Sequence, residues 1–360
     1  MKIAIDISQI IYKTGVSFYT ENLVKNLLKI DKENEYILFG GSLRQISTLK
    51  SQISKFEGNF TQKIFLFPPR LADLIWNRFH IFPIERLIGK IDIFHSSNWA
   101  QPPTDAFRVT TVHDLSFLKY SRLTDPIVLQ AQMRGLIRIK DEVDRIIVPS
   151  EATKADLLSF GIQKERIRVI PEAAGAGYRP RSAFEIEAVK RKFNIRGKYL
   201  VTIGIGGRKN TERLIKAFEL AKAGEDLKLV LAGTSFGKIK EDRGLIYTGC
   251  IFPDDELAAL ISGSEALVYP SLYEGFGLPV VQAFACGVPV VTSNVSSLPE
   301  VAGEAAILVN PFKVNEIAEG IKKAIRGRIG LIKKGFNRAK EYSWERTAEE
   351  TLKVYKESLI

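Results

Sequence analysis

One stretch of the sequence, Tyr273–Val291, places a carboxylate beside a pair of glycines and a predicted helix. Glu274 precedes a Gly-Phe-Gly turn, and the apolar run Leu278–Cys286 has the periodicity of a helix. Glycines let backbone amides approach a ligand closely, and the first turn of a helix offers N–H groups that bind anions. A carboxylate beside them accepts hydrogen bonds from hydroxyl groups. The combination favours a site for a hydroxylated anionic ligand over an ordinary turn that Glu274 caps.

A second stretch, Ile203–Phe218, places two cations after a glycine-rich turn. Arg208 and Lys209 stand just before the helix expected at Thr211–Ala223. Arg offers a bidentate fork and Lys a point charge, so the pair suits a diphosphate and the charge that develops on it as it leaves. The glycine spacing matches neither a dinucleotide fingerprint nor a Walker A loop, which disfavours a dehydrogenase. A solvated basic turn is the alternative.

Two further candidate positions lie in the N-terminal half. His113 follows the predicted strand Val109–Val112, at the end of the strand where parallel sheets bind ligands. Its ring could bond a hydroxyl or a carbonyl, with Asp114 either orienting it or capping the next turn. Gly15 lies in a predicted loop before the helix Ser17–Leu28, where backbone amides could contact phosphate or acceptor. A first turn without a ligand is the alternative there.

Short apolar runs alternate with helical patterns along the chain, which predicts parallel α/β architecture. The expected strands of the first half are Lys2–Ile7, Tyr36–Phe39, Ile91–His95, Val109–Val112, Arg145–Pro149 and Ile167–Ile170. Those of the second half are Tyr199–Gly204, Lys228–Ala232, Ile246–Thr248, Ala266–Tyr269 and Val288–Thr292. Helices expected besides those named above are Ala152–Phe160, Asp254–Gly263 and Val314–Ile325.

The stretch Pro171–Ser182 is rich in Gly, Ala and Pro and separates the two series. A chain of 360 residues suits two domains of ordinary size. We therefore predict two Rossmann-like, doubly wound domains, residues 1–175 and 176–343. The carboxyl ends of their sheets are expected to face each other across a ligand-binding cleft.

The net charge of +11 favours anionic partners such as nucleotides or phospholipid surfaces. No nucleic-acid-binding signature accompanies it, so nucleic acid is not expected. The cysteines, Cys250 and Cys286, and the histidines, His80, His95 and His113, lack the spacing of a disulfide framework or a metal site. The N-terminus reads as a strand rather than a signal peptide, and no apolar run has the length of a membrane span. These features predict a cytoplasmic protein, soluble or peripheral to the inner face of the membrane.

The segment Phe67–Lys90 mixes aromatic, basic and aliphatic residues. Such a segment could lie on a membrane and admit a lipid-linked acceptor. A core-forming stripe is the alternative, and it is the interpretation that the sequence favours slightly.

Taken together, these segments resemble the family-4 retaining glycosyltransferases of the GT-B fold. The similarity spans nearly the whole chain, from TGVSFYTENL and VTTVHDLSF through GRKNTERLIKAF to YPSLYEGFGLPVVQAFACGVPVV and the closing YSWERTAEETLKVYKESL. The resemblance implies that residues 344–360 return to an N-terminal acceptor domain, and that residues 176–343 bind a nucleotide-sugar donor. It is greatest to mannosyltransferases that build cell-surface polysaccharides, whose acceptors are saccharides or lipid-linked.

The resemblance also implies residue roles. Glu274 would hold hydroxyls of the donor sugar, Arg208 and Lys209 would bind the diphosphate, and His113 would contact the sugar or the acceptor region. The implied donor-binding set is Gly15, Gly275, Phe276, Gly277, Leu278, Gln282 and Glu300.

One position departs from the family motif, which pairs two glutamates eight positions apart. The second position is Gln282 here. Glutamine keeps a carbonyl acceptor but loses the charge, so each bond to the donor ribose should weaken by roughly 1 kcal/mol. We expect weaker donor binding and unchanged chemistry.

The same resemblance implies retention of the anomeric configuration without a protein nucleophile, with the leaving phosphate as base. No DxD constellation is present, and two cations with a helix dipole can stabilise the leaving group, so neither a metal nor another cofactor is expected. Two alternatives stay open. A nucleotide-sugar epimerase would need an acid–base pair that His113 and Glu274 do not establish. An inactive nucleotide-sugar-binding protein would explain Gln282, but not the presence of Glu274, Arg208 and Lys209.

Overall fold

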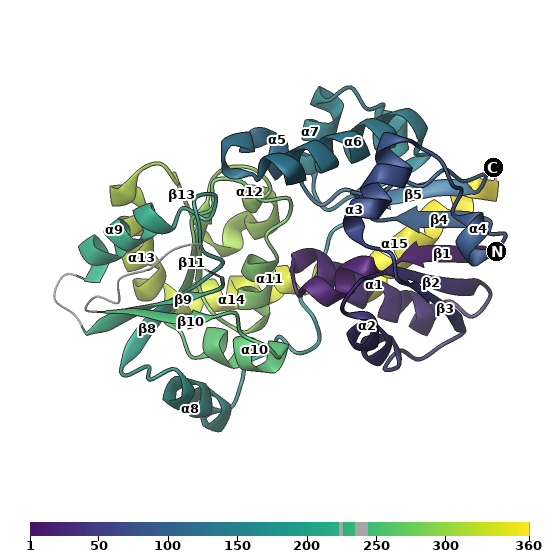
Figure 1. The fold of residues 1–360 in the computed structure, drawn as a ribbon. Helices are drawn as coiled ribbons and strands as arrows, with labels where there is room; N and C mark the ends of the chain where they lie inside the picture. Colours follow the sequence, from purple (N-terminus) through teal and green to yellow (C-terminus); the bar gives the residue numbers. More distant parts are fainter. Residues whose placement is uncertain (223–225, 235–243, 360) are drawn as a thin grey trace. The chain divides into compact units, whose positions relative to one another are not determined.

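The computed structural model describes residues 1–222, 226–234 and 244–359, which form two compact units (Figure 1). The first unit comprises Met1–Glu172 and Trp344–Ile360, and the second comprises Ala173–Ser343. The chain first passes from one unit to the other between residues 172 and 173, whereas the sequence predicted this boundary between residues 175 and 176. The stretch predicted as a linker runs without helix or strand until Ser182 caps the next helix.

The first unit is built on a seven-stranded parallel sheet in the order β3-β2-β1-β4-β5-β6-β7. Its strands are β1 (Lys2–Asp6), β2 (Glu35–Gly41), β3 (Phe60–Phe65), β4 (Ile93–Ser96), β5 (Phe107–Thr111), β6 (Arg145–Val148) and β7 (Ile167–Val169). Its longer helices are α1 (Gly15–Ile30), α2 (Ile46–Ile53), α6 (Pro126–Glu142), α7 (Glu151–Ser159) and α15 (Trp344–Lys356). The strand order reverses between β1 and β4, which creates a crevice at their carboxyl ends.

The second unit repeats this plan with a six-stranded parallel sheet in the order β10-β9-β8-β11-β12-β13 (Figure 1). Its strands are β8 (Lys198–Ile203), β9 (Leu227–Ala232), β10 (Leu245–Gly249), β11 (Ala266–Tyr269), β12 (Val290–Ser293) and β13 (Ile307–Val309). Its helices are α8 (Ala183–Lys192), α9 (Thr211–Lys222), α10 (Asp254–Ser262), α11 (Leu278–Ala285), α12 (Leu298–Ala302), α13 (Val314–Arg326) and α14 (Arg328–Ala339). Here the order reverses between β8 and β11.

Several elements differ from the sequence-based prediction. Helix α1 begins at Gly15 because Thr14 caps it, with Ser17 completing a capping box. Gly15 therefore lies in the first helical turn, and its prediction as a loop residue was wrong. Strands β3 and β13 and helices α2, α6, α8, α12 and α14 were not predicted. The predicted last residue of α9, Ala223, lies outside the described residues.

The segment Phe67–Lys90, for which the sequence left two interpretations, packs in part beside the sheet of the first unit. Ala72, Trp76, Ile84 and Ile88 are buried together there. This confirms the core interpretation for those residues.

The final helix belongs to the first unit, as the resemblance implied. Helix α15 packs along α1, where the Trp344 ring meets Phe18 and Tyr19 edge-on, at centroid distances of 5.9 and 5.7 Å. The Thr347 hydroxyl donates to the Pro171 carbonyl at 2.7 Å, just before the chain leaves the unit. These contacts make α15 part of the core of the first unit. Within the described ranges, no helix is both long and apolar enough to cross a membrane.

We predict that Trp344→Ala lowers the free energy of unfolding by about 3–5 kcal/mol, because it removes a large buried ring from between α1 and α15. Urea denaturation monitored by circular dichroism measures the change. Glu345→Ala, at the exposed neighbouring position, is the control and should shift it by less than about 1 kcal/mol. An equal loss in both variants would contradict the packing role of Trp344.

Candidate active site

The loop after β8 fixes the positions of Arg208 and Lys209 at the carboxyl end of that strand. Gly204 has a φ of +82°, and a Cβ there would lie 2.9 Å from Cε of Lys209, so a larger residue would displace the lysine side chain. Asn210 has a φ of 61°, a left-handed conformation that asparagine adopts more readily than most residues. Its side-chain amide donates to the Pro270 carbonyl at 3.1 Å. The loop after β8 is thereby tied to the loop after β11.

The loop after β11 carries Glu274 and is held by two serines. The Glu274 backbone N–H donates to the Ser296 hydroxyl at 3.0 Å. The Ser297 hydroxyl lies 2.9 Å from the Glu274 carbonyl and 2.8 Å from the Phe276 carbonyl. Gly277 is the N-cap of α11 and has a φ of 109°, which residues with a Cβ rarely adopt. The Gly-Phe-Gly turn therefore leads from a fixed carboxylate into the N-terminus of α11.

Two ion pairs join the loop after β8 to the loop after β11. Nη1 of Arg208 lies 3.0 Å from Oε2 of Glu274, and Nζ of Lys209 lies 2.6 Å from Oε1. Arg208 also donates to the Tyr273 carbonyl at 2.8 Å. Burial alone would raise the pKa of Glu274, but Lys209 and Arg208 outweigh it and lower that pKa to about 2. Glu274 is therefore an ionised, buried carboxylate with a cation at each oxygen.

Tyr269, the last residue of β11, is a member of this cluster that the sequence did not reveal. Its hydroxyl donates to Oε1 of Glu274 at 2.9 Å and accepts a bond from Lys209, whose ammonium lies 4.8 Å from the ring centroid. Burial, followed by the charge of Glu274, raises the pKa of Tyr269 well above its usual value. The phenol stays protonated and links the carboxylate to the lysine.

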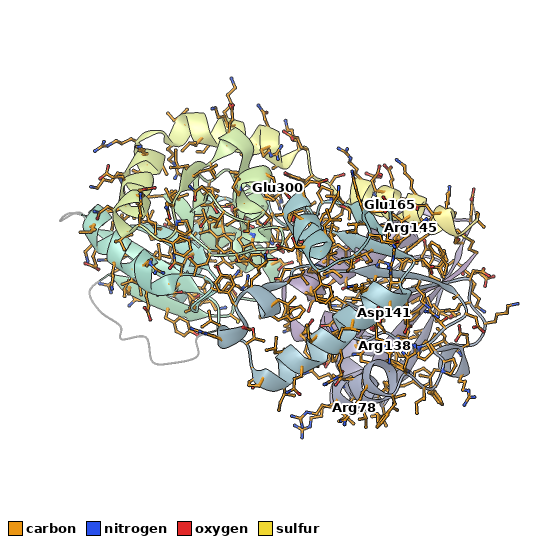
Figure 2. The ribbon with its side chains drawn as sticks, turned by 90° about the horizontal axis from the view of Figure 1, so that it is seen from above. Arg78, Arg138, Asp141, Arg145, Glu165 and Glu300 are labelled. Carbon is orange, nitrogen blue, oxygen red and sulfur yellow. The ribbon has the colours of Figure 1, made fainter. Side chains whose placement is uncertain are left out.

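The other predicted residues of the second unit lie near this cluster in sequence. Gly275, Phe276 and Gly277 are buried in the turn before α11, and Leu278 is half-buried at its first position. Gln282 is buried on the second turn of α11. Glu300 is exposed on α12, where its backbone carbonyl accepts a bond from Arg338; Figure 2 labels its side chain.

His113 lies in the first unit, just past the end of β5. Its Nδ1 is 3.1 Å from Oε1 of Glu172, and its ring meets that of Tyr19 edge-on at 4.6 Å. The Asp114 carboxylate instead accepts from the Ser116 N–H at 2.8 Å, so of the two roles that the sequence left open it caps the next turn. The partner of His113 is Glu172, which the sequence did not single out.

A pocket opens at the carboxyl ends of β1, β4 and β5, where the strand order reverses. Asp6, Gln9, Val16, Asn98 and His113 are among its lining residues. Gly15 precedes Val16 in the first turn of α1 but is not one of them. The pocket is thus lined by both polar and apolar side chains, among them the predicted residue His113, and it lies within the first unit.

Two residues that line this pocket, His95 and Thr111, belong to a buried hydrogen-bond network. Nδ1 of His95 is 2.6 Å from the Tyr355 hydroxyl, and Nε2 is 2.9 Å from the Thr111 hydroxyl. Burial, together with the nearby charge of His113, lowers the pKa of His95 to about 3. The His95 ring is therefore neutral at pH 7 and joins α15 to the sheet. In the described parts of the chain, no group of three or more His, Cys, Asp or Glu side chains is arranged to hold a metal ion.

Comparison with known families identifies the class of protein. Residues 14–173 match the family described as Glycosyltransferase Family 4, and residues 185–343 match Glycosyl transferases group 1. The chain therefore belongs to the family-4, group 1 glycosyltransferases, which are enzymes of the GT-B fold. This membership favours glycosyl transfer over epimerisation.

Individual relatives agree with that assignment. The chain is 29% identical over 367 residues to O-antigen chain mannosyltransferase B of Escherichia coli, an alignment that covers 95% of this chain and 96% of that protein. It is 30% identical over 265 residues to the serotype-specific mannosyltransferase WbdA of Escherichia coli, covering 67% of this chain but only 32% of the longer relative. The crystal structure of Anabaena HepE in complex with UDP and glucose superposes with a TM-score of 0.74 at 15% identity, covering 99% of this chain and 100% of HepE. The superposition confirms the fold.

We predict that Tyr269→Phe lowers transferase activity and also destabilises the protein by about 1–3 kcal/mol, because it leaves a buried carboxylate with one donor fewer. Tyr199→Phe is the matched control: its buried hydroxyl donates to the Leu260 carbonyl at 2.7 Å, away from Glu274. Urea denaturation and nucleoside diphosphate release measure the two effects. Tyr199→Phe should lose stability only, and a similar loss of activity in both variants would contradict a role for Tyr269 in the site.

Proposed function

We propose that this enzyme transfers a hexose, mannose in the first instance, from a nucleotide-diphosphate sugar to a saccharide or lipid-linked acceptor in cell-surface polysaccharide synthesis, with retention of anomeric configuration. The observation that carries the proposal is the junction of Arg208, Lys209 and Glu274 beside the Gly-Phe-Gly turn. The choice of mannose rests on the similarity to the two Escherichia coli mannosyltransferases.

The donor would bind in the second unit. The diphosphate would lie against Arg208, Lys209 and the N-terminus of α11, because the two cations and the helix dipole supply positive charge there. Glu274 would accept hydrogen bonds from hydroxyls of the hexose. Its ionised state supports that role, because a carboxylate accepts stronger hydrogen bonds than a neutral carboxylic acid does. Gln282 and Glu300 would serve the nucleoside side of the donor.

The acceptor would bind in the first unit, in the pocket at the reversal between β1 and β4. Asp6, Gln9 and Asn98 offer acceptors and donors of the kind that sugar hydroxyls use. His113 would contact the transferred sugar, with Glu172 holding the orientation of its ring.

In the proposed reaction, the bond between the anomeric carbon and the diphosphate oxygen breaks while the acceptor hydroxyl attacks from the same face. The leaving phosphate takes the proton of that hydroxyl. Arg208, Lys209 and the N-terminus of α11 would stabilise the charge that develops on the diphosphate. On this mechanism the enzyme needs neither a protein nucleophile nor a metal ion.

We place the reaction in the cytoplasm, at the inner face of the membrane. Neither Cys250 nor Cys286 is in a disulfide, which fits a reducing compartment. The net charge of +11 suits a surface of anionic phospholipid, from which a lipid-linked acceptor could be drawn.

We predict that Glu274→Ala reduces transfer at least about a hundredfold, since it removes the proposed contact to the donor sugar and the carboxylate that orients both cations. Purified protein is incubated with a panel of nucleotide sugars, with and without saccharide and lipid-linked acceptors and with EDTA. Released nucleoside diphosphate is measured, and circular dichroism checks the fold. Glu304→Ala, at an exposed position on the same unit, is the control.

Release that requires an acceptor and survives EDTA supports metal-independent transfer. A changed donor sugar without released diphosphate would indicate an epimerase, and no change in any mixture would indicate an inactive binding protein. Near-normal turnover by Glu274→Ala would remove Glu274 from the site.

Gln282→Glu is expected to tighten donor binding roughly fivefold, because it restores the charge of the family motif and is worth about 1 kcal/mol. Isothermal titration calorimetry with the donor identified above measures the dissociation constant. Unchanged or weaker binding would show that position 282 does not contact the ribose as the family motif implies.

A further inference from the structure

A series of hydrogen bonds leads from α15 to the pocket of the first unit. The Tyr355 hydroxyl lies 2.6 Å from Nδ1 of His95, and Nε2 of His95 lies 2.9 Å from the Thr111 hydroxyl. The Thr111 hydroxyl lies 3.1 Å from that of Tyr19 on α1. We define the buried network as these four residues. Tyr355 is fully buried, whereas the other three line the pocket, so only one end of the network meets a ligand.

Burial fixes the protonation states of the buried network. Together with the nearby charge of His113, burial lowers the pKa of His95 to about 3, so at pH 7 its ring has one N–H and one bare nitrogen. Burial also raises the pKa of Tyr19 and that of Tyr355 above their usual values, so both phenols keep their hydrogens. The network therefore has a polar hydrogen on each of its four residues, but only three hydrogen bonds join them.

The closed end of the network sets the direction of its bonds. Within the described residues, the Tyr355 hydroxyl has no hydrogen-bond partner other than Nδ1 of His95. It must donate to Nδ1, because its hydrogen would otherwise be buried without an acceptor, which is costly. His95 therefore carries its hydrogen on Nε2 and donates it to the Thr111 hydroxyl.

The surplus hydrogen consequently lies at the open end. Thr111 and Tyr19 each carry a hydroxyl hydrogen, but only one of these hydrogens can lie in the bond between them. Apart from the bonds given above, neither hydroxyl has a partner among the residues that the structure describes. One hydroxyl hydrogen of this pair is therefore left for a group that enters the pocket.

Aromatic contacts hold this donor in place. The Tyr19 ring meets the Trp344 ring edge-on at a centroid distance of 5.7 Å and the His113 ring edge-on at 4.6 Å. A donor that is already fixed loses little conformational freedom when a ligand binds. The hydroxyl pair is thus a rigid part of the pocket wall, next to His113.

The pocket also carries an acidic group. The described residues that line it include Asp6 but no lysine or arginine. The Asp6 carboxylate accepts from the Ser8 N–H at 2.9 Å and from the Ser97 hydroxyl at 2.7 Å. A carboxylate has about four lone-pair sites, so Asp6 can accept further bonds. A phosphate would lie near this acid without a cation, whereas sugar hydroxyls both donate and accept.

We infer that the Tyr19–Thr111 hydroxyl pair donates one hydrogen bond to an oxygen of an uncharged saccharide, and that Asp6 accepts a hydrogen bond from a hydroxyl of the same sugar. The inference rests on the proposed function, because it takes this pocket to be the acceptor site. It adds that the end of the acceptor that enters the pocket is a neutral sugar rather than a sugar phosphate or a uronic acid. In a lipid-linked acceptor, the phosphate would stay outside the pocket.

The direction of the network is tested by NMR of the wild-type protein with ¹⁵N-labelled histidine. The His95 ring should be neutral at pH 7 with its hydrogen on Nε2, as read from long-range ¹H–¹⁵N correlation spectra. The chain has three histidines, so His80→Gln and His113→Gln identify the other two sets of signals. A hydrogen on Nδ1 would place the surplus hydrogen on Tyr355 and overturn the inference, whether or not the enzyme transfers a sugar.

The ligand class is tested with methyl α-D-mannopyranoside as the neutral probe and mannose 6-phosphate as the anionic probe. Dissociation constants are measured by saturation-transfer NMR, with inorganic pyrophosphate present to occupy Arg208 and Lys209. The wild type should bind the neutral probe at least about tenfold more tightly, because Asp6 repels the phosphate. Tyr19→Phe with Thr111→Val should weaken binding of the neutral probe about five- to tenfold, because it removes one hydrogen bond to the sugar.

The matched control is Tyr36→Phe with Thr351→Val, two buried hydroxyls of the same unit that do not line the pocket. They donate to the Asp31 carboxylate at 2.6 Å and to the Thr347 carbonyl at 2.7 Å. The control should bind the neutral probe like the wild type.

Equal loss in the control, undiminished binding after Tyr19→Phe with Thr111→Val, or a wild type that binds neither probe or prefers mannose 6-phosphate would each overturn the inference. Binding of the probes requires no transfer, so a failure here is distinct from a failure of the proposed reaction. The NMR measurement on the wild type decides the direction of the network even where a variant folds poorly.

Discussion

The buried carboxylate of Glu274 depends on the two cations beside it, and the strand order of the second unit brings these three charges together. Removing a carboxylate from water costs several kcal/mol unless opposite charge and hydrogen bonds compensate. Arg208 and Lys209 come from the loop after β8, and Glu274 comes from the loop after β11. These strands are parallel neighbours, so both loops emerge at the same edge of the sheet. The reversal of strand order thus brings together charges that are far apart in the sequence.

The first unit uses the same topology for a different chemistry. Its reversal, between β1 and β4, opens a pocket that is lined by apolar and hydrogen-bonding side chains, with no lysine or arginine among the described lining residues. His113 reaches that pocket from the end of β5 and is held by Glu172. The neutral, buried His95 ring lines the same pocket and is hydrogen-bonded to Tyr355 of α15. One architecture therefore offers a charged site in one unit and a hydrogen-bonding site in the other.

Local signals in the sequence were enough to predict most strands and the start of α11 and to choose Arg208, Lys209 and Glu274 as candidates, but they did not predict the ion pairs between these residues. They failed where structure depends on long-range contacts. Strand β3 has exposed polar residues at its centre and lies at the edge of its sheet, so it lacks an apolar pattern. Glu172 is 59 residues from His113, and no motif connects them. Tyr269 ends an ordinary strand pattern, and only the fold brings its hydroxyl to Glu274.

The return of α15 to the first unit sets the order in which the two units mature during synthesis. Residues Met1–Glu172 leave the ribosome before Trp344, so the face of α1 that packs on α15 stays uncovered until α15 emerges. Ala173–Ser343 is continuous in sequence, so this unit can fold without waiting for α15. The unit made first is therefore complete only once α15 has emerged, and a nascent chain that stalls before Trp344 would leave Phe18 and Tyr19 without their ring contacts to it.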